Sequence, residues 1–209
     1  MISNKQLDIL RESVCEGLSE YRARHILEVE KMVVRLGELY VPKINLNKLR
    51  AAALLHDITK ELKTDEQLKL CKEYGIELSA CDINSPKTLH AIIAAAIIPE
   101  KYPTFADDKI ISAVRWHTSG RAVMRLFDKL IFLADYIDMS RTFEDCIAVR
   151  NFFWEASPED MDIPSRSELL RQSLILACDF TVKLLVDEGA PISPYTVEMR
   201  NDLIISGRK

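Results

Sequence analysis

Apolar residues recur at intervals of three and four along most of the chain, which is the spacing of one face of an α-helix. The residues that follow this spacing in the first two segments are Leu7, Leu10, Val14, Leu18, Ile26, Val29, Val33 and Leu36. No segment alternates between apolar and polar residues as a half-buried strand does. The pattern therefore predicts an all-α fold built from amphipathic helices.

Capping residues mark where several of these helices begin and end. Ser3 and Ser19 precede the first two apolar runs, where a side-chain oxygen can accept hydrogen bonds from free backbone amides. Gly75 and Gly189 follow two further helical runs, at the position where a left-handed glycine commonly ends a helix. Additional helices are predicted over residues 46–60, 86–98, 106–118, 126–138 and 144–156, with connectors such as CDINSP and PEKYPTFADD between them.

The chain shows no internal repeat and no long linker. Its 209 residues fit one domain. We interpret residues 1–209 as a single helical bundle, in which residues 158–209 form a C-terminal helical extension. With 48% apolar and 29% charged residues, the composition is that of a globular protein that folds without disulfides or a structural metal.

Charge, cysteine content and the N-terminus exclude several classes of partner and site. The formal net charge is -4 and the basic residues are dispersed, which argues against a nucleic-acid partner. Five scattered cysteines with no CxxC pair indicate neither a disulfide framework nor a cysteine zinc site. The sequence has no signal-peptide core and no apolar stretch of membrane-spanning length. We expect a cytoplasmic protein that binds neither nucleic acid nor membrane, and the sequence allows a homodimer.

The four histidines of the chain all stand inside apolar helical runs. They are His25, His56, His90 and His117. Asp135 also brings a carboxylate to an apolar face, in KLIFLADYI, and burying an ionised carboxylate is costly unless it is paired or bound to a metal. One such histidine alone is more often an ordinary core residue. The complete set matches the way helical bundles build metal centres from facing side chains.

These residues form the ordered pattern H…HD…H…H…D, in the runs RHILE, LLHDITK, TLHAI, RWHTSG and FLADYI. The candidate metal ligands are His25, His56, Asp57, His90, His117 and Asp135. Imidazoles and carboxylates without thiolates suit Fe, Mn, Zn, Co or Ni. Such ions generate a metal-bound hydroxide at neutral pH and polarise phosphoryl oxygens, so the pattern favours phosphoryl hydrolysis. Lys60 follows Asp57 by three residues, and on the predicted helix its ammonium shares the same face.

The ordered pattern resembles the HD-domain superfamily of hydrolases. This resemblance implies an HD-domain helical bundle in which one metal is held by His25, His56, Asp57 and Asp135. It implies that the two intervening histidines hold a second ion, bridged to the first by Asp57.

A closer resemblance lies in the runs YRARHILEV, AALLHDITK, LHAIIAA, AVRWHTSG, KLIFLADYID, SRTFED and VRNFF, over roughly residues 20–155. These are similar to the YqeK-type symmetrical bis(5'-nucleosyl)-tetraphosphatases. The resemblance implies an iron-containing centre of one or two ions, with Mn, Co, Ni or Zn as alternatives, that splits the dinucleoside polyphosphate diadenosine tetraphosphate into two ADP. Asp57 and Lys60 are then catalytic. The substrate contacts that it implies are Lys60, Thr118, Ser119, Gly120 and Arg141, with Arg150 as a further candidate.

The chain departs from this pattern at two places: HTSG stands where the family has HTTG, and Asp138-Met139 stands where it has an acidic residue and a proline. Three other functions stay open. The chain could be an HD phosphohydrolase or phosphodiesterase for another nucleotide, an iron oxygenase, or a non-catalytic nucleotide-sensing module. Lys60 and Arg141 favour phosphate over dioxygen, and retention of all six ligand-type residues argues against a vestigial site.

Overall fold

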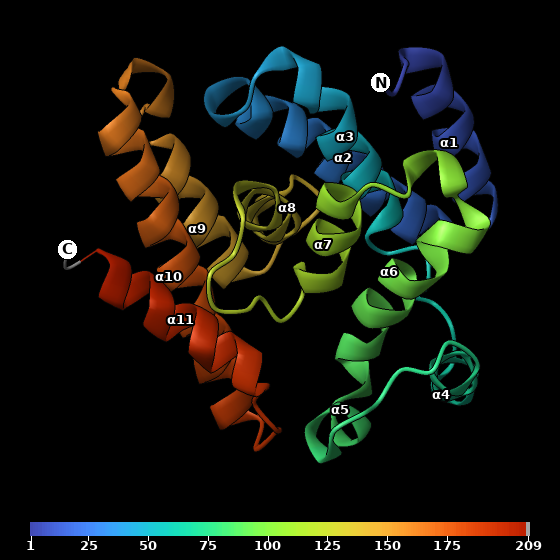
Figure 1. Ribbon diagram of the computed structural model, residues 1–209. Helices are drawn as coiled ribbons and strands as arrows, with labels where there is room; N and C mark the ends of the chain where they lie inside the picture. Colours follow the sequence, from blue (N-terminus) through green and yellow to red (C-terminus); the bar gives the residue numbers. More distant parts are fainter. Residues whose placement is uncertain (208–209) are drawn as a thin grey trace.

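The computed structural model describes residues 1–207 and confirms the all-α prediction, since this part of the chain forms eleven α-helices and no strand (Figure 1). The helices are α1 (Asn4–Glu16), α2 (Glu20–Tyr40), α3 (Lys43–Leu55), α4 (Thr64–Glu73), α5 (Ala80–Asn84), α6 (Leu89–Lys101), α7 (Asp108–Trp116), α8 (Leu126–Ile137), α9 (Glu144–Trp154), α10 (Ile163–Asp187) and α11 (Pro194–Ser206). Short 3-10 segments are Pro86–Thr88, Pro103–Phe105 and Pro158–Asp160.

The predicted helix ends are confirmed where a local signal defines them. The Ser3 and Ser19 side chains cap α1 and α2 by accepting hydrogen bonds from backbone amides three residues later. Gly75 and Gly189 follow α4 and α10 with a φ of 62°, a left-handed conformation that glycine adopts without strain. The connector CDINSP was wrongly predicted to be irregular, because Ser79 caps the short helix α5 within it.

The helix predicted over residues 46–60 is wrong at its end, because α3 stops at Leu55. The residues that follow form turns, and the Lys60 amide donates to the Asp57 carbonyl across 3.0 Å. The physical reason is tertiary: the Thr59 hydroxyl donates to the backbone carbonyl of His90, on α6, across 2.8 Å. This contact directs the chain off the axis of α3, so Lys60 reaches its position through a turn rather than along a helical face.

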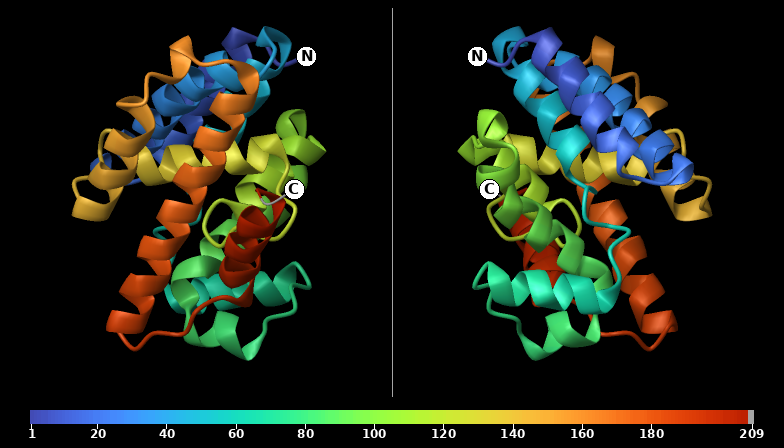
Figure 2. Two further views of the ribbon diagram at one scale, coloured as in Figure 1. Left: turned by 90° about the vertical axis from the view of Figure 1, so that its left-hand side faces the viewer. Right: turned by 90° about the vertical axis from the view of Figure 1, so that its right-hand side faces the viewer.

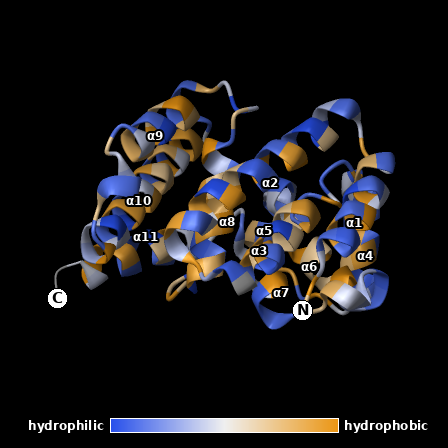
Figure 3. Ribbon diagram, turned by 90° about the horizontal axis from the view of Figure 1, so that it is seen from above, coloured by the Kyte–Doolittle hydropathy of each residue, from blue (hydrophilic) through white to orange (hydrophobic). Residues whose placement is uncertain are grey.

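Helix α8 lies at the centre of the bundle and is seen end-on in Figure 1. It packs against α2, α3 and α7 on one side and against α9 and α10 on the other. Buried apolar residues of these helices form one core, and Figure 3 shows that apolar and polar stretches alternate along their ribbons. A smaller apolar cluster forms where α4 packs on α6, at the end of the molecule away from α1, α2 and α3 (Figure 2).

The C-terminal helices share the main core. Leu169 and Leu174 of α10 and Met199 and Leu203 of α11 belong to the same buried cluster as the apolar residues of α2 and α8. This shared core supports the interpretation of residues 1–209 as one domain with an extension from 158, which stays a prediction. Among residues 1–207, no helix has the length and apolar character that a bilayer crossing requires.

Candidate metal centre

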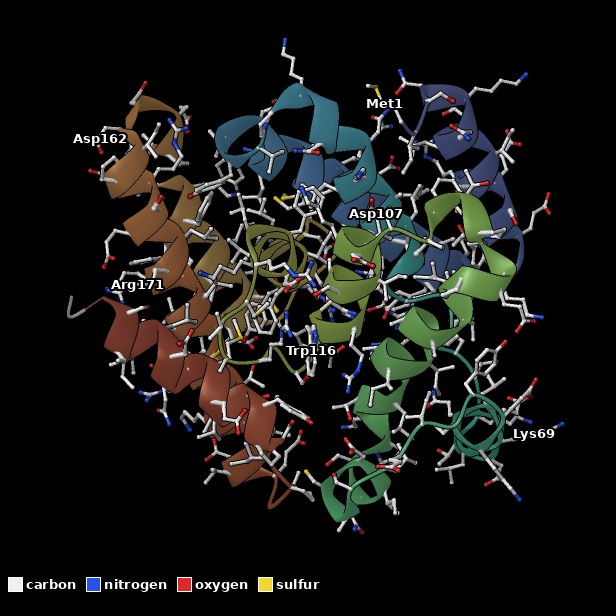
Figure 4. The ribbon with its side chains drawn as sticks, in the orientation of Figure 1. Met1, Lys69, Asp107, Trp116, Asp162 and Arg171 are labelled. Carbon is white, nitrogen blue, oxygen red and sulfur yellow. The ribbon has the colours of Figure 1, made fainter. Side chains whose placement is uncertain are left out.

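The bundle brings the six predicted ligands together from separate segments. His25 lies on α2, His56 and Asp57 follow α3, His90 lies in the first turn of α6, His117 follows α7, and Asp135 lies on α8. Trp116, the last residue of α7, marks this region in Figure 4. The side chains of the ligands other than Asp135 are at most 3% exposed, whereas the Asp135 side chain keeps 17% of its surface exposed. The cluster is therefore closed on most sides and open at Asp135.

The two carboxylate oxygens of Asp57 face different histidines. Its Oδ2 lies 3.6 Å from Nε2 of both His25 and His56. Its Oδ1 lies 3.1 Å from Nε2 of His90 and 3.6 Å from Nε2 of His117. In each of these two sets, including Asp57, the possible ligand atoms lie within 4.8 Å of one another. This geometry fits a carboxylate placed between two cation sites.

Backbone carbonyls orient two of the imidazoles. His56 Nδ1 lies 2.6 Å from the carbonyl oxygen of Ala53, and His117 Nδ1 lies 2.8 Å from that of Val114. Because a carbonyl oxygen only accepts, Nδ1 carries the proton in both rings, and Nε2 presents a lone pair to the centre. The buried Nε2 atom of His56 has no hydrogen-bond partner within residues 1–207. Buried polar atoms are rarely left unsatisfied, so the donor set fits a bound transition ion.

The charge states of two carboxylates and two imidazoles suit a cation as well. Burial opposes ionisation of Asp57, but the adjacent imidazoles, His56 above all, hold its pKa well below the usual value. Burial also opposes ionisation of Asp135, but Arg141 and an adjacent imidazole hold that pKa well below the usual value too. Burial lowers the pKa of His56 to about 3 and that of His90 to about 4. Ionised carboxylates and neutral imidazoles are the forms that bind metals.

His25 is held between two carboxylates. Its Nε2 lies 3.0 Å from Asp135 Oδ1, and its Nδ1 lies 3.3 Å from Asp138 Oδ2 and 3.1 Å from the Ser140 hydroxyl. Burial lowers the pKa of His25, but hydrogen bonds to Asp135 and Asp138 outweigh it and raise the pKa to about 9. Sequence reasoning treated Asp138 only as a departure from the family pattern. Its position three residues after Asp135, at the end of an apolar run, was the available signal for a supporting carboxylate.

Three cationic side chains surround the cluster. Lys60 Nζ lies 3.3 Å from His90 Nδ1, and Arg141 Nη2 lies 2.6 Å from Asp135 Oδ1. Arg22, which sequence reasoning missed, pairs with Asp57 Oδ2. Its position one helical turn before His25, facing the same way, was a readable signal. Burial lowers the pKa of Lys60 from its usual value. The positive charges of Arg22 and Arg141 lower it further.

The predicted HTSG contacts divide between two environments. The Thr118 hydroxyl lies 2.9 Å from His117 Nε2, within the centre. Ser119 is buried, and its carbonyl accepts a hydrogen bond from Thr196 of α11. Gly120 has a φ of 64°, and an added Cβ would lie 2.0 Å from the sulfur of Met199. The structure therefore brings Thr118 to the site and turns Ser119 and Gly120 toward α11, while their substrate roles stay predictions.

The Arg150 side chain forms hydrogen bonds with backbone atoms. Its guanidinium donates to the carbonyl oxygens of Ile137, Asp138 and Arg141. These bonds hold the loop that carries Arg141, so the described contacts of Arg150 are with this loop rather than with the metal cluster.

A cavity of about 1000 Å³ opens onto the centre. Its walls include His117, Thr118, Asp135 and Arg141 at one end and residues of α9 and α10 at the other. The partly exposed face of Asp135 thus lies on a space that can hold a substrate of nucleotide size.

Comparisons with known proteins show the family to which the chain is related. The family model described as HD domain matches residues 22–140. The chain is similar to the symmetrical bis(5'-nucleosyl)-tetraphosphatase of Halalkalibacterium halodurans, with 30% identity over 90% of this chain and 91% of the relative. A Bacillus subtilis protein of the same name is 28% identical over 91% and 94% of the two chains. A Clostridium acetobutylicum crystal structure, described as a predicted HD superfamily hydrolase involved in NAD metabolism, is 31% identical, covers 100% of both chains and has a TM-score of 0.81.

Proposed function

This chain belongs to the HD domain family, and on that premise we propose that it hydrolyses diadenosine tetraphosphate symmetrically into two molecules of ADP. The observation that carries the proposal is the division of the Asp57 oxygens between two sets of imidazoles, beside a cavity of nucleotide size. Relatives that align with about nine-tenths of the chain are symmetrical bis(5'-nucleosyl)-tetraphosphatases, which supports this substrate over other nucleotides.

The assignment of ligands to ions follows the two carboxylate oxygens of Asp57, which face different histidines. One ion would be held by His25, His56, Asp57 and Asp135, and a second by Asp57 with His90 and His117. Iron is the expected metal, and Mn, Co, Ni or Zn also suit these donors. Such ions, when bound, polarise phosphoryl oxygens and supply a nucleophilic hydroxide from water at neutral pH.

Cationic side chains of the chain neutralise the polyphosphate. Lys60 is suited to stabilise charge that develops in the transition state, because it is half-buried and its Nζ lies against the imidazole of His90. Arg141 lines the cavity, and its planar guanidinium suits two-point contact with a phosphate. Arg22 adds a third positive charge at Asp57. The Thr118 hydroxyl is placed to donate to a phosphoryl oxygen.

Symmetrical cleavage requires attack at an inner phosphorus of the tetraphosphate. The leaving group is then ADP, whose terminal phosphate departs more easily than a nucleoside alkoxide. The experiment is hydrolysis of diadenosine tetraphosphate in ¹⁸O-labelled water by the metal-loaded protein. ADP is expected as the product, with the label in one ADP of each pair, on its β-phosphate. AMP plus ATP would contradict symmetrical attack, and no cleavage of any nucleotide would favour the sensor function.

A second candidate substrate class comes from the solved relative, whose description places that protein in NAD metabolism. A comparison of kcat/KM for diadenosine tetraphosphate, NAD and nucleoside diphosphates tests it. A larger kcat/KM for NAD than for diadenosine tetraphosphate would replace our proposal with this candidate.

A further inference from the structure

We propose that the groove between α9 and α10 is a nucleoside subsite, which takes the ribose and base of one half of the substrate with the base stacked on Phe143. The inference rests on the proposed function, because it assigns the cavity beyond the metal centre to the non-reacting part of a nucleotide. It also assigns substrate selection to a segment outside residues 22–140, the part of the chain that the HD domain model matches.

The cavity connects the two regions without interruption. The same space is lined by Asp135 and Arg141 at the metal centre and by Phe143, Phe180 and Leu184 farther out. Helices α9 and α10 pack side by side next to α8 (Figure 1). Residues of both helices line the space onto which Asp135 opens. A ligand whose phosphates reach Asp135 therefore extends along this wall.

The outer part of the cavity presents aromatic and aliphatic surface. Phe143 is 61% exposed and Leu184 is 52% exposed, although both line the cavity. Phe180 is half-buried beside them, and Phe132 of α8 is buried at the same cavity. An exposed aromatic ring on the wall of a cavity is suited to stacking with a nucleobase, because every base has a π-face.

The distribution of charged residues along the cavity predicts the orientation of a bound nucleotide. Glu144, Asp145, Asp187 and Glu188 line the outer part of the cavity, and its lysine, Lys183, is paired with Asp187 across 2.5 Å. This end repels phosphate, whereas Arg141 attracts phosphate at the metal centre. Carboxylates accept hydrogen bonds from ribose hydroxyls and from exocyclic amines of a base. The phosphates therefore lie at the metal centre and the nucleoside lies between α9 and α10.

One short loop supplies both contacts. Arg141 and Phe143 are separated by a single residue, so their backbone positions lie at most about 7 Å apart. The Arg141 guanidinium turns inward to Asp135, while the Phe143 ring remains exposed in the cavity. This separation is comparable with the ribose that stands between a base and its first phosphate. Arg150 holds the loop through the carbonyl oxygen of Arg141.

The test compares the full-length, metal-loaded protein with the variant Phe143→Ala. Binding of ADP and of inorganic pyrophosphate is measured by calorimetry, together with kcat/KM for diadenosine tetraphosphate. Loss of one base-stacking contact should weaken ADP binding and lower kcat/KM by about 5- to 100-fold. Pyrophosphate affinity and metal content should stay unchanged, because neither depends on the base. Phe143→Trp should restore ADP affinity to within a few-fold of the original.

Phe152→Ala is the matched control, because Phe152 is an exposed phenylalanine of α9, 44% exposed, that does not line the cavity. The control should bind ADP normally. The inference is overturned if Phe143→Ala leaves ADP binding unchanged, weakens pyrophosphate equally, or is matched by Phe152→Ala. It is also overturned if the unmodified protein binds no ADP. Selective loss of ADP binding in a protein that does not cleave diadenosine tetraphosphate would support the subsite and reject the proposed function.

Discussion

The Thr59 hydroxyl donates a 2.8 Å hydrogen bond to the backbone carbonyl oxygen of His90. The turn that carries Asp57 is thereby fastened to the helix that carries His90, whose Nε2 lies 3.1 Å from Asp57 Oδ1. Both Thr59 and His90 are buried, so solvent does not compete for this contact. It fixes the separation between ligands that lie far apart in the sequence.

We predict that Thr59→Val weakens binding of the second ion by about tenfold, because the supporting contact of one ligand pair is lost. The free energy of unfolding of the metal-free protein should fall by about 1 kcal/mol, the usual contribution of one hydrogen bond. Metal titration and chemical denaturation measure the two effects. Ser173→Ala is the control, because it removes a buried hydroxyl that donates to Leu169 within α10. That variant should lose stability without losing metal, and equal metal loss in both would contradict the prediction.

Metal content should respond differently to the loss of Asp57 and to the loss of a histidine that faces only one of its oxygens. We expect Asp57→Ala to lose both ions, because both of the proposed ion sites include this carboxylate. His90→Ala should lose mainly one ion, because His90 faces only Oδ1. Elemental analysis of the purified variants checks this, together with the rate of ADP release, which should fall below detection for Asp57→Ala. Full activity in a metal-free Asp57→Ala protein would exclude the metal centre.

Asp138→Asn should loosen the orientation of His25. The carboxylate of Asp138 contributes to raising the pKa of His25 to about 9, so its replacement by a neutral amide should lower that pKa. Metal affinity should fall by about 10- to 100-fold, the usual effect of losing a group that orients a ligand. NMR titration of the chelated protein follows the four imidazoles separately. An unchanged pKa of His25 would show that Asp138 does not support this ring.

Lys60→Met should retain the metals and lose about 10²-fold or more in kcat, the scale of one preorganised electrostatic contact. Lys63→Met is a matched control three residues away, because the Lys63 side chain is exposed. Steady-state kinetics and elemental analysis distinguish the roles of the two lysines. Loss of metal from Lys60→Met would mean that this ammonium supports the cluster rather than the reaction.

Several structural properties could be predicted from local sequence alone. Helical spacing of apolar residues predicted the all-α fold, because a helix buries one face and that requirement repeats every few residues. The same spacing predicted that His25, His56, His90 and His117 point inward, and the structure confirms that each is buried. Local signals also defined helix ends at Ser3 and Ser19, since a cap acts on amides only three residues away.

Other features depended on contacts between distant segments. The end of α3 was mispredicted because the Thr59 side chain hydrogen-bonds to α6, and no local pattern near residue 59 indicates that partner. The Asp138 carboxylate was read as a loop variation because its partner, His25, lies on another helix. Ser119 and Gly120 follow His117 directly, yet Thr196 and Met199 of α11 turn them away from the cavity.

By itself, the sequence determined the helices, the inward face of each and the order of the candidate ligands, because these follow from the periodicity of a single helix. The family resemblance implied that Asp57 bridges two ions, but only the tertiary structure decided which imidazoles face each of its oxygens, and that α9 and α10 form the wall beyond Asp135. Both depend on how helices pack across the bundle. Packing is a property of pairs of surfaces, so it cannot be read from either helix alone.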